Sequence, residues 1–372
     1  MIRGAISILA LALALVVISP RRAQAYPQFQ LAKDQTCSGC HISPAGGGLL
    51  TENGLNTASA ISQLGTAPEF LNAAFGLPDW LDLGGDLRGT GGYFQTPFRS
   101  LAAFPMQTDI YASPHYKGFR LYVTAGYRPP ERGNASTTTA WSREHYLMWQ
   151  QNDGSAEGLF VRVGRFMPVI GLRLAEHPTY IRRFGGTALY TETYGASVSY
   201  IAKDFEVHAS GFVADPLIDA VDTAKGGAVY GEYRVTEKAS VGLEGMLQRT
   251  ADDRRLRGGI TGKLLAPGDV LLEAELQLVS QKIDGTRGAK QLVGYLLGSR
   301  ELGSGLLLDI GLGHYDENTA VKNLDRDCAD LNLHWFTTSH VELIWNNRIE
   351  MIGLGKGGPT GAYSLIQLHY RL

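Results

Sequence analysis

Two cysteines and a histidine lie close together near the start of the chain. Cys37-Ser38-Gly39-Cys40-His41 has the spacing C-x-x-C-H, which is typical of covalent attachment of c-type haem. Two thiols about one helical turn apart can each add to a vinyl group, and the next imidazole can bind the iron from the proximal face. The motif therefore predicts one covalent haem c, with Cys37 and Cys40 as thioether links and His41 as the proximal iron ligand.

Other chemistries of paired thiols fit this sequence less well. A structural zinc site needs four ligands, and the third cysteine, Cys328, lies far along the chain. A thioredoxin-type pair belongs in a βαβ context, which the sequence lacks. Haem attachment is therefore the favoured interpretation.

The iron could take a second ligand from elsewhere in the chain. Our candidates for this distal ligand are His177 and Met167, because both lie in one long connection that could fold back toward the haem. His208 and His369 are expected to point inward, and Met106 is the internal methionine nearest to the motif in sequence. A second His or Met would saturate the iron for electron transfer, whereas an open position would allow ligand chemistry.

The first residues predict export. Arg3 precedes an uncharged, largely apolar run at Gly4–Ile18, and Ala23-Gln24-Ala25 is a small-x-small cleavage site. We expect residues 1–25 to be a signal peptide. The run is short for a spanning helix, which needs about twenty residues.

The next stretch, residues 26–79, is expected to form the haem-binding segment. It is small for an independent domain, so we expect it to act as a plug or to lie at the periplasmic mouth of something larger. Thr57–Leu64 and Pro68–Phe75 are predicted to be short helices. The haem itself would supply part of the missing core.

From Trp80 onward the hydrophobic period is two, as in β-strands. Most of the segments have about ten residues or more, the length that a tilted strand needs to cross a bilayer. Tight turns alternate with longer polar connections, as in outer-membrane barrels. We count about sixteen such segments, near 80–93, 106–115, 119–128, 142–150, 158–166, 193–202, 203–213, 226–235, 237–248, 254–265, 269–280, 289–299, 304–315, 326–336, 339–349 and 360–372.

The sequence therefore predicts an all-β fold, in which residues 80–372 form an antiparallel outer-membrane barrel of about 16 strands. A large soluble sandwich, propeller or solenoid is the alternative, because alternation alone does not exclude it. The chain ends inside a strand on Leu372, at the position where outer-membrane proteins usually carry Phe. Strand length, loop alternation and the export signal together favour the barrel.

Polar members of each strand would face the lumen of such a barrel. The connection 167–192 would either project outside or fold back and constrict the pore. The inward set is expected to carry charges of both signs: Asp82, Asp86, Arg88, Arg120, Arg128, Glu206, His208, Glu244, Glu273, Glu275, Asp309 and Asp330.

Composition excludes several classes of function. The chain has 372 residues, a net charge of −2 and only 19% charged residues, so it is not a strongly electrostatic nucleic-acid binder. Three cysteines cannot build a disulfide framework. The remaining functions are those of an exported, membrane-embedded protein.

A signal peptide, one C-x-x-C-H motif and then a porin-sized barrel form a distinctive order. This order resembles the fused monohaem cytochrome–porins of the bacterial outer membrane, whose haem motif also follows a Pro-aromatic stretch like Tyr26-Pro27-Gln28-Phe29. The resemblance implies electron passage across the outer membrane, with the haem segment in the lumen or at the periplasmic mouth. It implies a periplasmic electron carrier, an external partner such as ferrous iron or another reductant, membrane lipid, and no nucleic acid.

Two other functions stay open on the sequence. The chain could be a diffusion porin in which the haem segment is a structural plug or sensor. It could also be a haem enzyme with an open iron position, although an electron carrier is the favoured interpretation.

Overall fold

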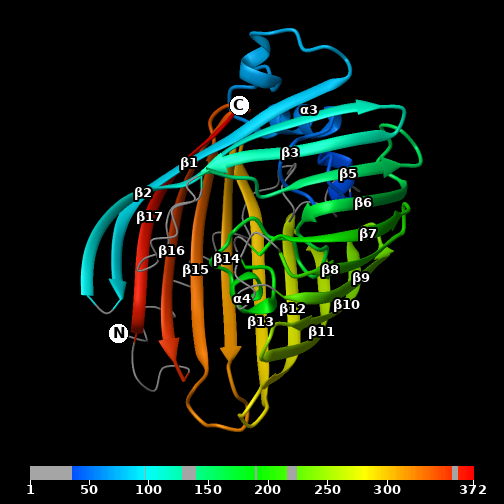
Figure 1. Cartoon of the computed structure of the whole chain (residues 1–372). Coiled ribbons are helices and arrows are strands. Elements are labelled where there is room, and N and C mark those ends of the chain that lie inside the picture. Colours follow the sequence, from blue (N-terminus) through cyan, green and yellow to red (C-terminus); the bar gives the residue numbers. More distant parts are fainter. Residues whose placement is uncertain (1–35, 97, 128–139, 189–190, 216–223, 354–358) are drawn as a thin grey trace.

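Strands dominate the part of the chain that follows the haem motif (Figure 1). The computed structural model describes residues 36–372 apart from 97, 128–139, 189–190, 216–223 and 354–358. The predicted signal peptide, the stretch 26–29 and Arg128 therefore lie outside the described residues. Within the described ranges no helix is long and apolar enough to cross a membrane.

Three short helical elements precede the sheet, and one more interrupts it. The first three are α2 (Cys37–Cys40), α3 (Glu52–Ile61) and the 3-10 element η2 (Phe70–Ala73), and the fourth is α4 (Tyr180–Gly185). The strands are β1 (Leu81–Thr96), β2 (Phe98–Tyr116), β3 (Phe119–Tyr127), β4 (Ala140–Trp141), β5 (His145–Gln150), β6 (Gly158–Phe166), β7 (Thr193–Ile201), β8 (Phe205–Val213), β9 (Lys225–Thr236), β10 (Ala239–Arg249), β11 (Asp253–Ala266), β12 (Val270–Ile283), β13 (Ala289–Gly303), β14 (Leu306–Asp316), β15 (Arg326–Phe336), β16 (Val341–Ile352) and β17 (Pro359–Arg371).

The sheet closes on itself as an antiparallel barrel. Each strand pairs with its neighbour in the chain, and β1 pairs with both β2 and β17. Strands β4 and β5 both pair with β3, so they are two parts of one interrupted strand. The seventeen labels therefore describe a closed barrel of sixteen strands, which confirms the predicted fold class. Porins with sixteen to eighteen strands enclose an aqueous channel.

The two faces of the strands differ as the alternation predicts. In β12, Glu273 and Glu275 are buried inside, while Leu276 and Leu278 are exposed on the outer face. An outward apolar surface with a polar lumen is the arrangement that a bilayer demands of a barrel. The same parity places eight of the expected charged residues inside with little exposure: Asp86, Glu206, His208, Glu244, Glu273, Glu275, Asp309 and Asp330.

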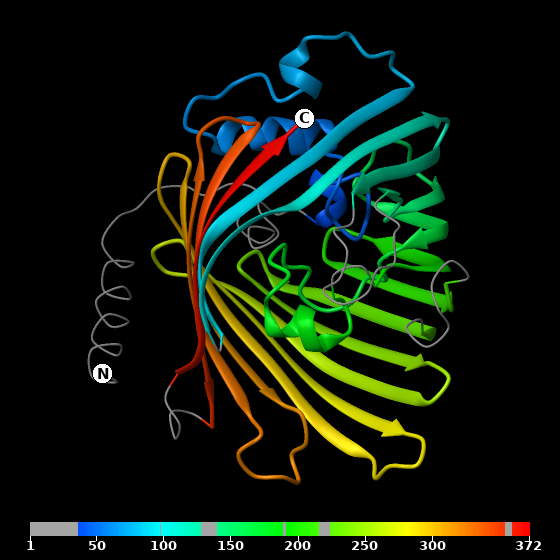
Figure 2. The same ribbon diagram turned by 60° about the vertical axis from the view of Figure 1, so that its left-hand side comes forward.

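The two ends of the barrel differ in the length of their connections. One end carries tight turns, such as 117–118 and 304–305, and the chain's C-terminus lies there as well (Figures 1 and 2). The other end carries the long connections. The predicted bounds of the first two strands, 80–93 and 106–115, were too short. In the structure β1 extends to residue 96 and β2 begins at residue 98, so the two strands form a longer hairpin.

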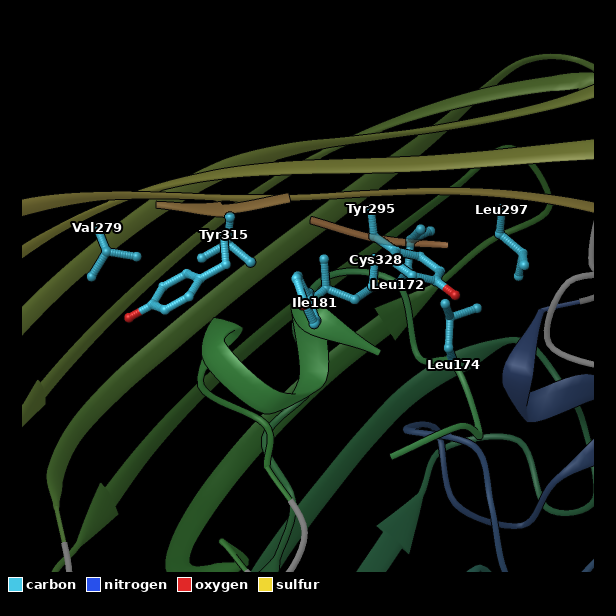
Figure 3. Close-up of a cluster of buried hydrophobic side chains, with 10 residues drawn as sticks. Leu172, Leu174, Ile181, Val279, Tyr295, Leu297, Tyr315 and Cys328 are labelled. Atoms are coloured by element: carbon cyan, nitrogen blue, oxygen red, sulfur yellow. The ribbon is translucent and has the colours of Figure 1, made fainter. Parts of the chain in front are cut away.

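The long connection 167–192 folds back into the lumen. Its helix α4 places Tyr180 and Ile181 in a buried apolar cluster with Val293 and Tyr295 of the barrel wall (Figure 3). Phe184 stacks on Tyr315, with 3.9 Å between the ring centroids. The sequence left open whether this inner loop projects or folds back, and apolar residues on both sides hold it inside.

The haem-motif segment, residues 36–79, lies at the tight-turn end of the barrel, with α2 inside the barrel and α3 and η2 across its rim (Figure 2). Gln63 N and Leu64 N donate hydrogen bonds to the carbonyls of Phe336 and Thr337, at the turn between β15 and β16. Ser38 Oγ donates to Ala156 O in the turn between β5 and β6. The short helices predicted at 57–64 and 68–75 are wrong in their bounds, since α3 begins at Glu52 and η2 is a single irregular turn.

Candidate functional site

The residues predicted to do chemistry border one cavity inside the barrel. Its volume is about 550 Å³, and it lies between the haem-motif segment, the inner loop and the barrel wall. Cys37, Cys40 and His41 border it from one side, and Met167 and His177 of the inner loop border it as well. Residues far apart in the sequence are thus brought together around a space of ligand size.

Local backbone structure presents the motif to this cavity. Cys37–Cys40 form one helical turn, which His41 closes by donating its backbone N–H to Cys37 O at 2.8 Å. Cys37 and Cys40 are not joined by a disulfide. Residues 46, 47 and 48 then take φ of +82°, +75° and +62°, a left-handed run that glycine adopts without strain. This turn returns the chain so that Ile42 N donates to Leu49 O at 3.0 Å.

Contacts from the barrel wall and the inner loop hold the motif segment in place. Leu49 N donates a hydrogen bond to the Tyr122 hydroxyl at 3.4 Å. Arg162, which is fully buried, donates from Nη1 to Ser43 Oγ at 3.2 Å. Arg173 of the inner loop donates to Pro44 O at 3.2 Å. The turn that follows His41 is therefore held by the barrel wall at Ser43 and by the inner loop at Pro44.

Burial sets the protonation of the motif side chains. It raises the pKa of both the Cys37 and the Cys40 thiols. Burial, together with the positive charge of Arg371, lowers the pKa of His41 to about 4. The Nδ1 atom of His41 is buried and has no hydrogen-bond partner among the described residues. His41 is therefore a neutral imidazole near pH 7, the form that binds a metal.

The two candidates for a second ligand differ in their partners. Burial, followed by the positive charge of Arg182, lowers the pKa of His177 well below its usual value. Its Nδ1 is buried and has no partner among the described residues. Met167 Sδ accepts a hydrogen bond from Thr191 Oγ1 at 3.8 Å, and Met167 N donates to Glu144 Oε1.

The other candidates lie in the barrel wall. His208 pairs with Ser199 through Nδ1 and lies outside the residues that border the cavity. His369 borders the cavity, but Nδ1 contacts Glu342 Oε2 at 2.9 Å and Nε2 contacts Asp86 Oδ1 at 2.7 Å. Met106 is a residue of β2 and also lies outside the cavity lining.

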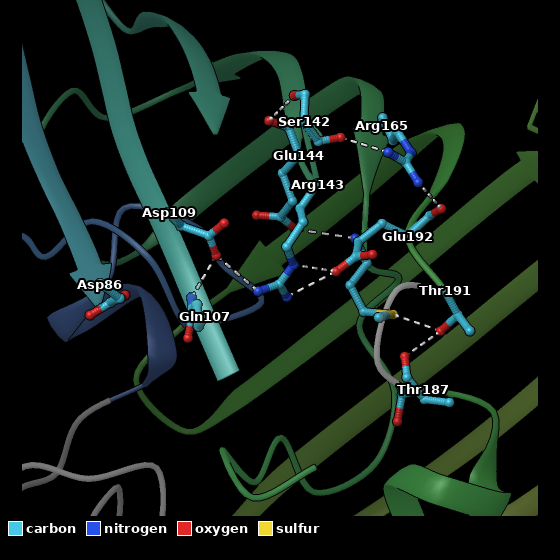
Figure 4. A network of polar contacts seen from close by, with 12 residues as sticks. Asp86, Gln107, Asp109, Ser142, Arg143, Glu144, Arg165, Thr187, Thr191 and Glu192 are labelled. Carbon is cyan, nitrogen blue, oxygen red and sulfur yellow. Dashed lines mark hydrogen bonds and ion pairs between the residues drawn. The ribbon is translucent and has the colours of Figure 1, made fainter. Parts of the chain in front are cut away.

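A polar network forms one side of the cavity (Figure 4). Arg143 contacts Glu192 Oε1 at 2.9 Å and Asp109 Oδ2 at 3.2 Å. Gln107 Nε2 donates to the same Asp109 oxygen at 2.6 Å and to the Tyr111 hydroxyl at 3.0 Å. These side chains fix the shape of the wall that faces the haem motif.

The network continues as a chain of imidazoles and carboxylates around the lumen wall. Glu342 Oε1 contacts His334 Nδ1 at 2.8 Å, and Glu342 Oε2 contacts His369 Nδ1. Asp86 then accepts from His369 and from the Tyr111 hydroxyl at 2.7 Å. Sequence analysis did not single out Glu342 or His334. Their signal was the strand parity, which places both on the inward face.

The residues around the cavity fit a covalent haem. Two thiols lie in one helical turn, a neutral imidazole with a buried, unpartnered nitrogen follows them, and a second such imidazole borders the same space. Five arginines border the cavity and could pair with the two carboxylates of a haem: Arg88, Arg143, Arg173, Arg182 and Arg371.

Comparisons with known proteins support the fold. No family model and no curated protein matches the chain. Among solved structures, OmpT of Vibrio cholerae, expressed in the outer membrane, superposes with a TM-score of 0.60 at 13% identity, over 80% of this chain and 99% of its own. An anion-selective porin from Comamonas acidovorans superposes with a TM-score of 0.58 at 14% identity, over 78% of this chain and 98% of its own. The outer membrane channel DcaP of Acinetobacter baumannii superposes with a TM-score of 0.55 at 10% identity, over 78% of this chain and 97% of its own. The chain therefore has the barrel fold of outer-membrane porins.

Proposed function

We propose that the protein is an outer-membrane electron conduit, a barrel that carries one covalent haem c within its lumen. It would pass electrons between an external donor or acceptor and periplasmic carriers. The observation that carries this proposal is the placement of Cys37, Cys40 and His41 on one cavity inside a closed barrel. A bound haem supplies one-electron redox chemistry, and the protein sets its access, ligation and potential.

Each residue of the motif has a separate task in this proposal. The Cys37 and Cys40 thiols form the thioether links, and the neutral imidazole of His41 binds the iron. Gly46 has φ of +82°, a left-handed conformation that glycine adopts without strain, where the chain turns beside Cys37. Arg162 and Arg173 hold the turn at Ser43 and Pro44, so the motif keeps its orientation toward the cavity.

In this proposal the two redox partners would reach the haem from opposite ends of the barrel. Tight turns of outer-membrane barrels face the periplasm, so a soluble periplasmic carrier would approach the end where the motif segment lies. An external donor would have to enter the lumen from the long-loop end. Ferrous iron or another reductant is the external partner that the cytochrome–porin resemblance implies.

A diffusion porin with the haem segment as a plug is the second candidate. The inner loop favours it, because α4 is fixed to the lumen wall as a constriction. In that case single-channel conductance in planar bilayers would survive a Cys37→Ala plus Cys40→Ala change with its size and ion preference intact.

Reconstitution in liposomes tests the leading proposal. The purified protein is inserted into vesicles that enclose a redox dye, and an external reductant that does not cross lipid is added. We expect reduction of the enclosed dye by the wild type, and a fall to the rate of empty vesicles for the Cys37→Ala plus Cys40→Ala variant. Equal rates for the two proteins would contradict an electron conduit.

A further inference from the structure

We infer that His177 of the inner loop is the second protein ligand of the haem iron. This inference rests on the proposed haem at Cys37, Cys40 and His41, and it goes beyond the sequence, which left His177 and Met167 as equal alternatives. It makes the haem a bridge between the motif segment and the loop that narrows the lumen.

The hydrogen-bond partners of the cavity histidines single out His177. Four histidines border the cavity: His41, His177, His340 and His369. His340 contacts Arg371 O at 2.7 Å through Nδ1 and Ala67 O at 2.7 Å through Nε2. Both nitrogens of His369 are engaged by carboxylates. If either ring gave up a hydrogen bond to bind iron, a buried polar group would lose its partner, which costs about 1–3 kcal/mol for each group.

His177 has no such contact to lose. Its Nδ1 is buried and has no partner among the described residues, the same condition as in His41. Because Nδ1 is enclosed by protein, an iron in the cavity would bind the other ring nitrogen, Nε2. No hydrogen bond among the described residues would have to break for this, in contrast to the rings of His340 and His369.

Met167 is less suited to the same task. Its sulfur already accepts a hydrogen bond from Thr191 Oγ1, and its backbone N–H is tied to Glu144. It also directly follows β6, whose last residue is Phe166, so its main chain is fixed by the barrel wall.

The backbone on both sides of His177 is anchored. Arg182 Nη1 donates to Leu174 O at 2.9 Å on one side. Arg348, which also holds Asp330 through two hydrogen bonds, donates to Pro178 O on the other. A ligand whose neighbours are fixed in this way binds with little ordering cost. The inner loop thus presents His177 toward the cavity as a preorganised group.

The optical spectrum of the full-length protein, purified from outer membranes, tests this inference. An iron with two imidazole ligands is low-spin and has no open position for carbon monoxide. We expect the reduced wild type to form no carbon monoxide complex and a His177→Ala variant to form it stoichiometrically. Added imidazole should return the ferric variant to the low-spin spectrum. His177→Met should keep a ligand of a different type and shift the ferric spectrum.

Met167→Leu and His314→Ala serve as controls, because His314 contacts Asp327 and lies outside the cavity lining. Both should keep the wild-type spectrum. A low-spin His177→Ala variant that excludes carbon monoxide would overturn the inference, and so would carbon monoxide binding by Met167→Leu. Since the thioether links keep haem on every variant, a wild type with no haem spectrum would instead contradict the proposed function.

Discussion

At the scale of single residues, a glycine allows the haem-motif segment to approach the barrel wall closely. Gly48 has φ of +62°, and a Cβ there would lie 2.0 Å from the Tyr122 hydroxyl oxygen. The residue beside it, Gly47, has a similar φ of +75° but open space around its Cβ position. A substitution at Gly47 therefore adds backbone strain alone, whereas the same substitution at Gly48 adds both backbone strain and a steric clash with Tyr122.

We predict that Gly48→Ala loosens the motif segment more than Gly47→Ala does. Each change adds about 1–2 kcal/mol of left-handed strain, and Gly48→Ala adds about 1–3 kcal/mol of overpacking against Tyr122. Hydrogen exchange of the amides at 41–50 measures the difference. Equal exchange rates in the two variants would show that the close approach to Tyr122 does not hold the segment.

Sequence reasoning identifies single residues well when their chemistry is local. The spacing of Cys37, Cys40 and His41 is visible without any fold. Partners that meet across the barrel, such as His41 and His177, are brought to one cavity only by closure of the sheet and by the fold-back of the inner loop. Nothing in the spacing of these residues encodes that meeting.

At the scale of elements, helix α3 begins earlier in the chain than the sequence pattern predicted. The sequence pattern placed a helix at 57–64, whereas α3 runs from Glu52 to Ile61 and Thr51 caps it by accepting from Gly54 N at 3.1 Å. A Cβ at Gly54 would lie 2.0 Å from Cys40 O. Gly54 is thus needed for close packing of α3 on the motif.

The inner loop depends on the apolar side chains of α4. We predict that Ile181→Ala loosens the loop by about 2–4 kcal/mol, since Ile181 is 2% exposed and its truncation leaves a cavity. Planar-bilayer recordings should then show larger and noisier conductance. Arg183→Ala is the control on the same helix, because Arg183 is exposed and is not a member of the apolar cluster; it removes a positive charge from the pore but should not add the noise of a loosened loop. Unchanged conductance in Ile181→Ala would argue that α4 does not define the constriction.

Strand β16 carries two glutamates in different environments. Glu342 is buried between His334 and His369, while Glu350 is partly exposed and lies 3.5 Å from Arg183. We predict that Glu342→Gln lowers the free energy of unfolding by about 3–5 kcal/mol, because it breaks a buried charge network. Glu350→Gln should cost less than about 1 kcal/mol. Denaturant unfolding in detergent measures both, and a similar loss in the two variants would contradict a structural role for the network.

At the scale of the whole molecule, the barrel was the most predictable feature. A bilayer outside and water inside impose a period of two on every strand, so sixteen segments could be recognised from the sequence alone. The bounds were less certain at β1 and β2, where strand pairing continues beyond the alternating pattern. The inner loop could not be placed, because apolar residues at 172–181 are compatible with several partners until the wall is known.

The most direct test of the account is whether the chain itself carries haem. Outer-membrane fractions are denatured, separated on a gel and stained for haem, and the mature polypeptide is weighed by mass spectrometry. We predict haem staining that persists in the denatured band and a mass increase of one haem, both abolished by Cys37→Ala plus Cys40→Ala. A folded barrel whose mass equals that of the bare polypeptide would contradict the account.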